Sequence, residues 1–411
     1  MKILFVHNNF PAQFRHIARA LASRPGIEVA AIGTTTAATQ PNIRLLKYDV
    51  PRVDVSQTHP FARRFDVECW RAEQVLYNLT GLSASGFYPD IIVAHPGWGE
   101  MLPLRTVFPK ARIIAYCEFF YANEGQDVGF DPEFPTTGLD GHIALHLKNA
   151  ASLFALNDCD DAISPTPWQR STFPKAWQPK IHVIHEGIDT DVVTPMPDIS
   201  IRLPYGRMLT AEDEVITFVS RNLEPLRGYH VFMRALPRIL DERPDAHVVI
   251  VGADGTSYGA AAPTGQTWEQ IFLEEVGSEL DLSRVHFAGS LSYQNYLKVL
   301  QISTAHVYLT YPFVLSWSLL EAMSAGCLVI GSDTAPVRDV INGENGLLVP
   351  FFDIERLSEQ VIEALRHRKR YAAMRQRARE TIRERFDLKR ICLPQMESFL
   401  LDGASKRGLR G

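Results

Sequence analysis

Two arginines six residues apart, Arg221 and Arg227, follow an apolar run, and Gly228 comes directly after the second. Planar guanidinium groups donate paired hydrogen bonds, so two of them on one loop can clamp a diphosphate. A helix that opens at the glycine would add its own N–H groups. The pattern therefore indicates a diphosphate site, and the alternative is a solvated turn with surface arginines.

A second segment, from Thr310 to Gly331, leaves an apolar strand, enters a helix rich in small residues and ends in another apolar strand. The N-terminus of such a helix attracts anions because its N–H groups and its dipole point the same way. Glu321, near the first turn, can accept hydrogen bonds from sugar hydroxyls. This is the layout of a nucleotide-sugar site; for the apolar Phe313, Leu315 and Trp317 the alternative is a packing role that shapes the loop. The alternative is a capping box, in which Glu321 bonds the backbone at Ser318.

Two loops in the first half also carry unusual residues, and in open α/β sheets the loops after strands hold the ligands. His95-Pro96-Gly97-Trp98 follows an apolar run; the glycine lets the backbone approach a ligand, and the indole offers a stacking face. Glu118 leaves another apolar run among aromatic residues, which suits sugar hydroxyls. The alternatives are a structural histidine and a salt-bridged glutamate.

The composition excludes several classes of protein. With 411 residues, two domains are the default. A net charge of -5, with both signs mixed along the chain, argues against nucleic-acid binding. Five scattered cysteines without a C-x-x-C pair indicate reduced thiols in the cytosol. We find no apolar run long enough for a signal peptide or a membrane span, and the sequence leaves peripheral membrane contact open.

Short apolar runs without alternation are typical of parallel strands covered on both faces. In the first half the predicted strands are 3–6, 29–32, 91–94, 113–116, 162–164 and 182–184, and the predicted helices are 14–22 and 142–156. Their alternation predicts an α/β sheet built from right-handed crossovers. The proline-rich stretch 194–206 is interpreted as a linker.

After that stretch the pattern of strands and helices restarts. We therefore predict a first domain over 1–195 and a second over 206–387, with a last helix, 388–405, that packs back on the first. The first loop, 7–13, has no G-x-G-x-x-G, so a dinucleotide fingerprint is absent. Acidic pairs at 158–161 and 189–191 lie beside predicted strands and are interpreted as structural, so no metal site is expected.

Taken together, these residues resemble the retaining glycosyltransferases of the GT-B fold, family 4, over nearly the whole chain. Val219–Gly228 is similar to the family's Gly-Arg…Lys-Gly diphosphate motif, with Arg227 in the lysine position. Gly252 and Leu291 match the strand ends that hold the nucleotide base. The run 320–326 matches the Glu-Ala-Met-Ala-x-Gly helix, and 185–189 matches the Pro-Asn-Gly-Ile-Asp turn.

The chain departs from the family at three places, one of which is the histidine commonly found after a central first-domain strand, displaced here by the Cys117-Glu118 region. Phe313 stands eight residues before Glu321, where the family usually carries a second glutamate. The first loop has Asn8-Asn9-Phe10 in place of a glycine pair. The chain thus resembles a variant branch of the family, so the donor preference of other family members does not carry over to it.

The resemblance implies two Rossmann-like α/β domains facing across a central cleft, as in GT-B enzymes. It implies transfer of a sugar from a nucleoside-diphosphate sugar to a hydroxyl acceptor, with retention of the anomeric configuration. Arg221 and Arg227 would neutralise the diphosphate, and Glu321 would bind the ribose. N–H groups around Leu315, Ser316, Trp317 and Ser318 would add the field of the helix N-terminus at the donor. Glu118 and His95 would contact donor sugar and acceptor. The remaining acceptor-side residues would be Asn9, Phe10, Gly97 and Trp98.

The resemblance further implies no bound metal or other cofactor, a sugar or lipid-linked acceptor, and a cytoplasmic enzyme that can lie at the inner face of the membrane. Two alternatives stay open. One is a nucleotide-sugar 2-epimerase of the same fold, for which Glu118 is the first-domain acidic candidate. The other is a catalytically silent nucleotide-sugar binding protein, suggested by Phe313.

Overall fold

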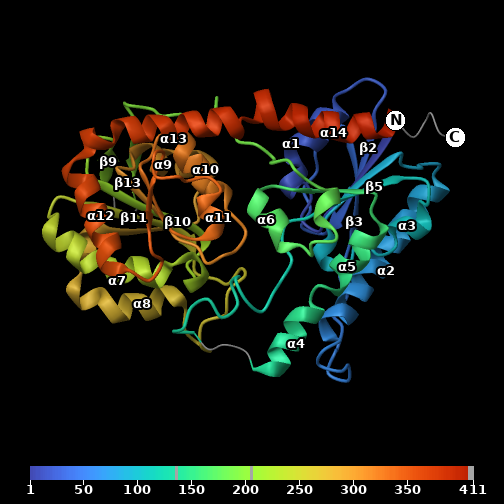
Figure 1. Ribbon diagram of the computed structural model, residues 1–411, viewed down its shortest axis with the longest axis horizontal. Helices are drawn as coiled ribbons and strands as arrows, with labels where there is room; N and C mark the ends of the chain where they lie inside the picture. The colour runs from blue at the N-terminus through green and yellow to red at the C-terminus, as the bar shows by residue number, and fades with distance from the viewer. Residues whose placement is uncertain (135–137, 204–206, 406–411) are drawn as a thin grey trace. The chain divides into compact units, whose positions relative to one another are not determined.

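The computed structural model describes residues 1–134, 138–203 and 207–405, without the side chains of the last three (Figure 1). The chain divides into two compact units. Unit 1 holds Met1–Gly187 and the segment from Leu388 onward, and unit 2 holds Ile188–Asp387. The chain therefore passes from unit 1 to unit 2 between Gly187 and Ile188, whereas the first domain predicted from the sequence ends at residue 195. Residues 204–206 of the predicted linker and the tail after 405 lie outside the described residues.

Unit 1 is built on a parallel sheet of seven described strands in the order β3-β2-β1-β4-β5-β6-β7. Most of these strands are buried on both faces, as expected from apolar runs without alternation. The strands are β1 Lys2–Val6, β2 Glu28–Thr34, β3 Ile43–Tyr48, β4 Ile91–Ala94, β5 Arg112–Tyr116, β6 Asp161–Ser164 and β7 Ile181–Val183.

Each face of this sheet has its own core. Alternate residues of β1 point to opposite faces, so Leu4 packs with α2, α3 and α5 while Phe5 packs with α1 and α14. The helices of unit 1 are α1 Arg15–Ala22, α2 Arg63–Ala84, α3 Leu104–Val107, α4 Leu139–Leu147, α5 Ala150–Asp158, α6 Pro167–Thr172 and α14 Leu393–Ser405, with short turns at η1 Ala12–Phe14, η2 Pro96–Trp98 and η3 Gln178–Lys180.

The C-terminal helix α14 packs in the core of unit 1. Met396 is 6% and Leu400 0% exposed, in one cluster with Ile3 and Phe5. Arg112 at the start of β5 donates from Nη1 to the carbonyl of Leu400 over 2.9 Å. A guanidinium that bonds carbonyls near a helix C-terminus satisfies acceptors that the helix itself leaves open.

Unit 2 contains a second parallel sheet, in the order β12-β11-β10-β13-β14-β15. Its strands are β10 Val215–Asn222, β11 His247–Ala253, β12 Val285–Gly289, β13 Ala305–Tyr308, β14 Val329–Ser332 and β15 Leu347–Val349. The helices α7, α8 and α12 cover one face, and α9, α10 and α13 the other (Figure 1). Their bounds are α7 Tyr229–Glu242, α8 Trp268–Val276, α9 Tyr293–Ile302, α10 Trp317–Ser324, α11 Ala335–Arg338, α12 Ile354–Arg366 and α13 Ala372–Arg385.

Three sequence predictions were wrong or incomplete. The helix predicted over 142–156 is two helices, α4 and α5, because the chain turns at Lys148 and Asn149, where the Asn149 side chain bonds the backbone of Tyr121. The strand β3 and the long helix α2 were missed. The predicted linker contains β8 Ser200–Arg202, which pairs with β9 Met208–Thr210. Among the described helices, none combines the length and apolar character needed to cross a bilayer.

Candidate functional site

The strands β11, β10 and β13 are parallel neighbours in unit 2, so the loops at their carboxyl ends share one edge of the sheet. The first of these loops runs through η5 Pro225–Arg227 into α7. Gly228 has φ +69°, and a Cβ there would lie 2.3 Å from Leu309 Cβ. Only glycine permits this approach, so the residue after Arg227 brings the β10 loop against the end of β13.

Arg227 bridges the two loops. Its Nη1 donates to Thr310 Oγ1 over 2.8 Å and to the carbonyl of Val314 over 3.1 Å. Arg221 is exposed, and its side chain makes no hydrogen bond or ion pair with the described residues. The structure thus fixes one of the two predicted diphosphate ligands and leaves the other extended into solvent.

The loop before α10 is packed on the core of unit 2. Leu315 is 8% exposed, and Trp317 packs against the same cluster. Ser316 is the N-cap: its Oγ accepts from the Ser318 N–H over 3.3 Å, and its own N–H donates to Tyr308 Oη over 2.9 Å. The other end of α10 is held by Arg375, which donates to the carbonyl of Gly326 over 2.6 Å.

The capping-box alternative for Glu321 was wrong. The cap is Ser316, so Glu321 is the fifth helical residue and lies beyond the first turn. Its Oε1 accepts from Tyr293 Oη over 2.8 Å, and its Oε2 from Tyr296 Oη over 2.7 Å. Burial, and after it Glu321, raise the pKa of Tyr296. Two phenol donors from α9 therefore orient this carboxylate, and neither tyrosine was predicted.

The two predicted base-binding residues have clear structural roles. A Cβ at Gly252 would lie 2.7 Å from Leu223 Cδ2, so the glycine lets the β10 loop pack on β11. Leu291 follows β12 and packs partly buried against the core cluster around Ile201 and Leu209. Gly252 lies near the carboxyl end of β11 and Leu291 follows β12, as predicted, but among the described residues of unit 2 no contact assigns either of them to a base.

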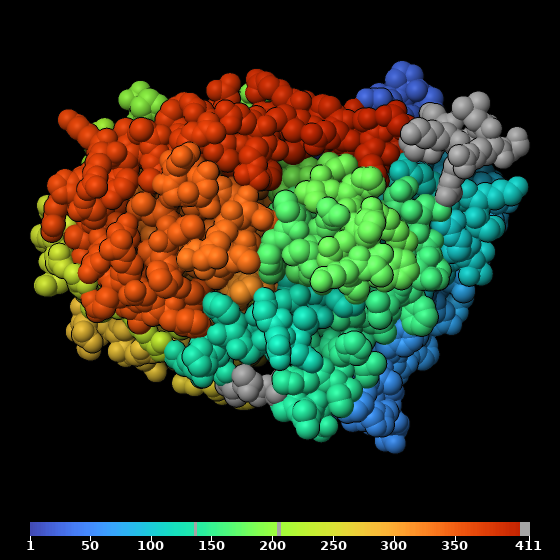
Figure 2. Space-filling model, in the orientation of Figure 1, coloured from blue at the N-terminus to red at the C-terminus, as the bar shows by residue number. Residues whose placement is uncertain are grey.

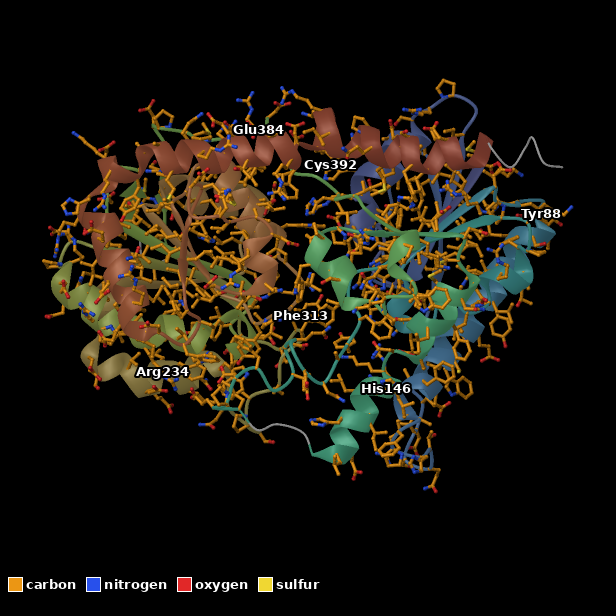
Figure 3. All side chains as sticks on the ribbon, in the orientation of Figure 1. Tyr88, His146, Arg234, Phe313, Glu384 and Cys392 are labelled. Atoms are coloured by element: carbon orange, nitrogen blue, oxygen red, sulfur yellow. The ribbon has the colours of Figure 1, made fainter. Side chains whose placement is uncertain are left out.

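Phe313, labelled in Figure 3, is 2% exposed. The Tyr258 ring lies 5.1 Å from the Phe313 ring, and the Arg227 guanidinium lies 5.8 Å from it. The position that carries a glutamate in the resembling family is thus an apolar contact here. Tyr258 was not predicted, although a tyrosine in a glycine-rich loop after a strand was a usable signal.

In unit 1 the carboxyl ends of β4 and β5 bring His95 and Glu118 together. His95 Nε2 lies 3.4 Å from Glu118 Oε2, while Glu118 Oε1 accepts from Gln13 Nε2 over 2.8 Å. The Gln169 side chain also bonds the backbone carbonyl of Glu118 over 2.9 Å. The Glu118 side chain keeps 20% of its surface exposed, so this oriented carboxylate can still accept a hydrogen bond from a ligand.

The His95 ring is held by its own loop. Its Nδ1 accepts from the Gly97 N–H over 3.0 Å, and its ring stacks on Trp98 at 4.0 Å. A Cβ at Gly97 would lie 2.8 Å from His95 Cε1. The glycine is therefore needed for the ring to fold back over the turn, which differs from the predicted approach of backbone to ligand.

His7 is a third member of this cluster that sequence reasoning missed. Its ring lies 5.5 Å from the His95 ring and 5.3 Å from the Trp98 ring. Burial, and after it His95, lower the pKa of His7 to about 3. Burial alone would raise the pKa of Glu118, but interactions with His95, Gln13 and His7 bring it below its ordinary value. The cluster thus holds a neutral His7 beside an ionised Glu118 at neutral pH.

Two residues of the first loop, Asn9 and Phe10, were predicted on the acceptor side, and the structure buries the Phe10 side chain. Phe10 is 0% exposed and lies in the unit 1 core, 6.4 Å from the Phe5 ring, so its side chain cannot meet an acceptor. Asn9 lies beside the cluster: its N–H donates to His7 Nδ1 over 3.0 Å, and its Oδ1 accepts from Thr36.

Comparison with known families matches both halves of the chain. Residues 25–193 match the family described as "Glycosyl transferase family 4 group". Residues 207–381 match "Glycosyl transferases group 1". Together the two segments include His95, Glu118 and the loops around Arg227 and Glu321, while His7 and Gln13 lie before the first segment.

Among curated relatives, a D-inositol 3-phosphate glycosyltransferase of Mycobacteroides abscessus is 28% identical over 189 residues, 45% of this chain and 39% of that protein. A GDP-mannose-dependent alpha-(1-6)-phosphatidylinositol monomannoside mannosyltransferase of Mycolicibacterium smegmatis is 24% identical over 285 residues, 67% of this chain and 68% of that protein. The matched part thus spans about two fifths of the first relative and two thirds of the second.

Solved structures share the fold. Sucrose-phosphate synthase from Thermosynechococcus elongatus matches with a TM-score of 0.74 at 18% identity, covering 98% of this chain and 100% of that one. HepE of Anabaena, solved in complex with UDP-glucose, matches with a TM-score of 0.65 at 16% identity, covering 97% and 100%. The predicted GT-B class, with two Rossmann-like α/β units, is confirmed.

Proposed function

The chain belongs to the family 4 glycosyltransferases of the GT-B fold, and from that premise we propose that it transfers a sugar from a nucleoside-diphosphate sugar to a hydroxyl acceptor with retention of configuration. The observation that carries the proposal is the bridge from Arg227 to Thr310 and Val314. It holds a cation at the carboxyl edge of the unit 2 sheet, between the β10 loop and the loop that enters α10.

Unit 2 binds the donor in this proposal. Arg227 and the exposed Arg221 stabilise the negative charge that grows on the leaving diphosphate. Arg227 lowers the barrier because a cation already held in place needs no reorientation during the reaction. The backbone around Leu315–Ser318 adds N–H donors. Glu321, oriented by its two tyrosines, accepts from the ribose hydroxyls.

Unit 1 contacts the donor sugar and the acceptor in this proposal. Glu118 is an ionised acceptor held by Gln13 and His95, and Trp98 adds an apolar ring beside it. A departing phosphate oxygen can take the proton of the attacking hydroxyl on the same face of the sugar, so Glu118 acts by binding hydroxyls. Because two arginines supply positive charge, the proposal includes no resident metal.

The acceptor proposed is a sugar or a lipid-linked sugar, and the location is the cytoplasm, including the inner face of the membrane. The name of one relative, a phosphatidylinositol monomannoside mannosyltransferase, supports a lipid-linked acceptor. So does α4, which lies on the surface in Figure 2 and has no buried residue. Leu139 is 81% and Ile143 44% exposed on it. Nucleic acid is not among the proposed partners.

Donor binding and turnover test the proposal. The purified chain is titrated with UDP and GDP and then incubated with UDP-glucose, UDP-GlcNAc and GDP-mannose plus an acceptor extract, with and without EDTA. Release of nucleotide together with a glycosylated product, unaffected by EDTA, is expected. Free epimerised donor would establish the epimerase instead, which none of the comparisons favours. Binding without any consumption of donor would establish a silent binding protein.

A further inference from the structure

Three loops of unit 2 converge on the Phe313 ring. Phe313 follows β13, Tyr258 follows β11 and Arg227 follows β10, and these strands are neighbours in the sheet. The Phe313 side chain is 2% exposed, with the Tyr258 ring 5.1 Å and the Arg227 guanidinium 5.8 Å from it. The aromatic pair therefore lies directly beside the cation assigned to the diphosphate.

Tyr258 is the solvent-facing member of this cluster. It is 50% exposed, and its ring is inclined by 49° to the buried ring of Phe313. A large exposed aromatic ring supported from beneath by a buried one is rigid in position and offers an apolar face with a hydroxyl at its end. Such a surface matches a sugar ring, which has C–H groups on its face and hydroxyls on its rim.

Glu224 fixes the loop that carries Tyr258. Its carboxylate is 2% exposed, and its Oε2 accepts from the Ser257 N–H over 3.1 Å and from the Gly259 N–H over 3.0 Å. These two donors flank Tyr258 in the chain. Asn222 adds a hydrogen bond from its amide to Ser257 Oγ. Burying a carboxylate is unfavourable unless charge-assisted hydrogen bonds compensate, and here both bonds go to the tyrosine's neighbours.

We propose that Tyr258, supported by Phe313 and held by Glu224, is the stacking face for the transferred sugar of the donor. The inference rests on the proposed function and deepens it: the donor's diphosphate lies at Arg227, and its sugar lies on the adjacent ring. The sugar class is a hexose that turns a C–H face to the protein on this side. Tyr258 contacts the substrate, and Glu224 is a positioning residue.

The test separates recognition of the sugar from recognition of the diphosphate. Affinities of UDP and UDP-glucose, and of GDP and GDP-mannose, are measured by calorimetry for the wild type and for Tyr258→Ala and Tyr258→Phe. Tyr258→Ala should weaken binding of the sugar nucleotide about tenfold while the free diphosphate binds within twofold of wild type. Tyr258→Phe keeps the ring and should keep the affinity. The exposed Tyr88→Ala in unit 1 is the matched control.

Glu224→Gln tests the positioning role. The amide keeps one acceptor oxygen but loses the charge, so the donor KM should rise several-fold with kcat and the affinity for free diphosphate little changed. Combined with Tyr258→Ala it should add no further loss, because both act through one ring. An unchanged ratio of sugar-nucleotide to diphosphate affinity in Tyr258→Ala overturns the inference. A wild type that binds neither UDP nor GDP overturns the proposed function, and the subsite with it.

Discussion

Arg227 donates to Thr310 Oγ1 through Nη1, the same nitrogen that bonds the Val314 carbonyl. Within the described residues, Nε and Nη2 of this guanidinium make no hydrogen bond, so one edge of the group holds the protein and the other can meet a ligand. One side of the guanidinium is therefore used in the protein's own structure, and the other remains available to a ligand.

Replacing Arg227 should reveal two separate effects, one on nucleotide affinity and one on the stability of unit 2. Arg227→Lys keeps the charge but not the fork, and Arg227→Ala removes both. For Arg227→Ala we expect UDP or GDP affinity to fall 10- to 100-fold, since charge-assisted bonds contribute about 1.5–3 kcal/mol. Loss of the loop bridge should also lower stability by about 1–2 kcal/mol. Calorimetric titration and urea unfolding measure the two effects.

The control for that experiment is Arg238→Ala, because Arg238 is paired with Glu242 and Glu355 on the surface of unit 2. It should leave the nucleotide affinity unchanged. A Kd for both diphosphates within twofold of wild type in Arg227→Ala would remove this residue from the site.

Glu321→Gln tests the proposed ribose contact. The contact is the same in the ground state and the transition state, so its loss should raise the donor KM about tenfold and leave kcat nearly constant. Steady-state kinetics give both constants. Tyr296→Phe should cost about 1 kcal/mol of stability by removing one hydroxyl from a partly buried hydrogen-bonded pair. A fall in kcat at constant KM would assign Glu321 to the chemical step instead.

Buried histidines should make the protein sensitive to acid. Burial lowers the pKa of His7, His185 and His306 from 6.5 to about 3. Between pH 6.5 and about pH 3 the unfolded chain binds more protons than the folded chain. The contribution of these histidines to the free energy of unfolding is therefore fully present above pH 6.5 and is lost as the pH falls below it. Each histidine contributes a slope of up to about 1.4 kcal/mol per pH unit. Urea unfolding from pH 7.5 to 4.5 measures it.

His306→Gln should lower that slope by about 1 kcal/mol per pH unit, since one buried imidazole no longer titrates. His367→Gln is the comparison, because its side chain is 50% exposed. Equal slopes in the wild type and His306→Gln would mean that His306 does not contribute to the acid sensitivity.

Gly97→Ala should disturb the site without unfolding the unit. The added methyl meets His95 Cε1 and forces the ring off Trp98, so we expect turnover to fall at least tenfold with a melting temperature close to wild type. Gly81→Ala is the matched control: it lies inside α2 with open space around it and should stabilise by about 0.5–1 kcal/mol. Full activity in Gly97→Ala would show that the stack has no part in the reaction.

The exposed face of α4 predicts contact with lipid. Leu139→Ser combined with Ile143→Ser should reduce flotation with anionic phospholipid vesicles about tenfold, because burial of each side chain contributes about 1.5–3 kcal/mol. Turnover of a water-soluble acceptor should stay constant. Leu282→Ser, at 50% exposure in unit 2, is the control. Equal flotation of all three proteins would contradict membrane contact through α4.

The sequence predicted the features that depend on local pattern. A buried parallel strand such as Ile91–Ala94 can be recognised from its own apolar run. The helix that carries Glu321 can be recognised from the motif at residues 320–326. The site's supporting groups depend on distant packing instead. Gln13 and Glu118 are 105 residues apart in the sequence, and Tyr293 and Glu321 are 28 apart. No sequence spacing therefore predicts either hydrogen bond.

One site prediction, for Phe10, and one alternative, the capping box at Glu321, failed for physical causes of the same kind. Phe10 lies in a loop, which predicts exposure, but the loop turns inward and its ring completes the core beside Phe5. Glu321 satisfied a capping-box spacing with Ser318, but the chain begins its helix two residues earlier, at a serine whose N–H bonds Tyr308. In both cases tertiary contacts overrode a local rule.

Because Met396 and Leu400 of α14 pack with Ile3 and Phe5, unit 1 is assembled from two separate stretches of the chain, while unit 2 is one continuous stretch. During translation unit 2 can complete its core before α14 is made, but the face of β1 that α14 covers stays exposed until then. A premature stop after residue 387 would therefore leave that apolar face of β1 uncovered for chaperones or aggregation.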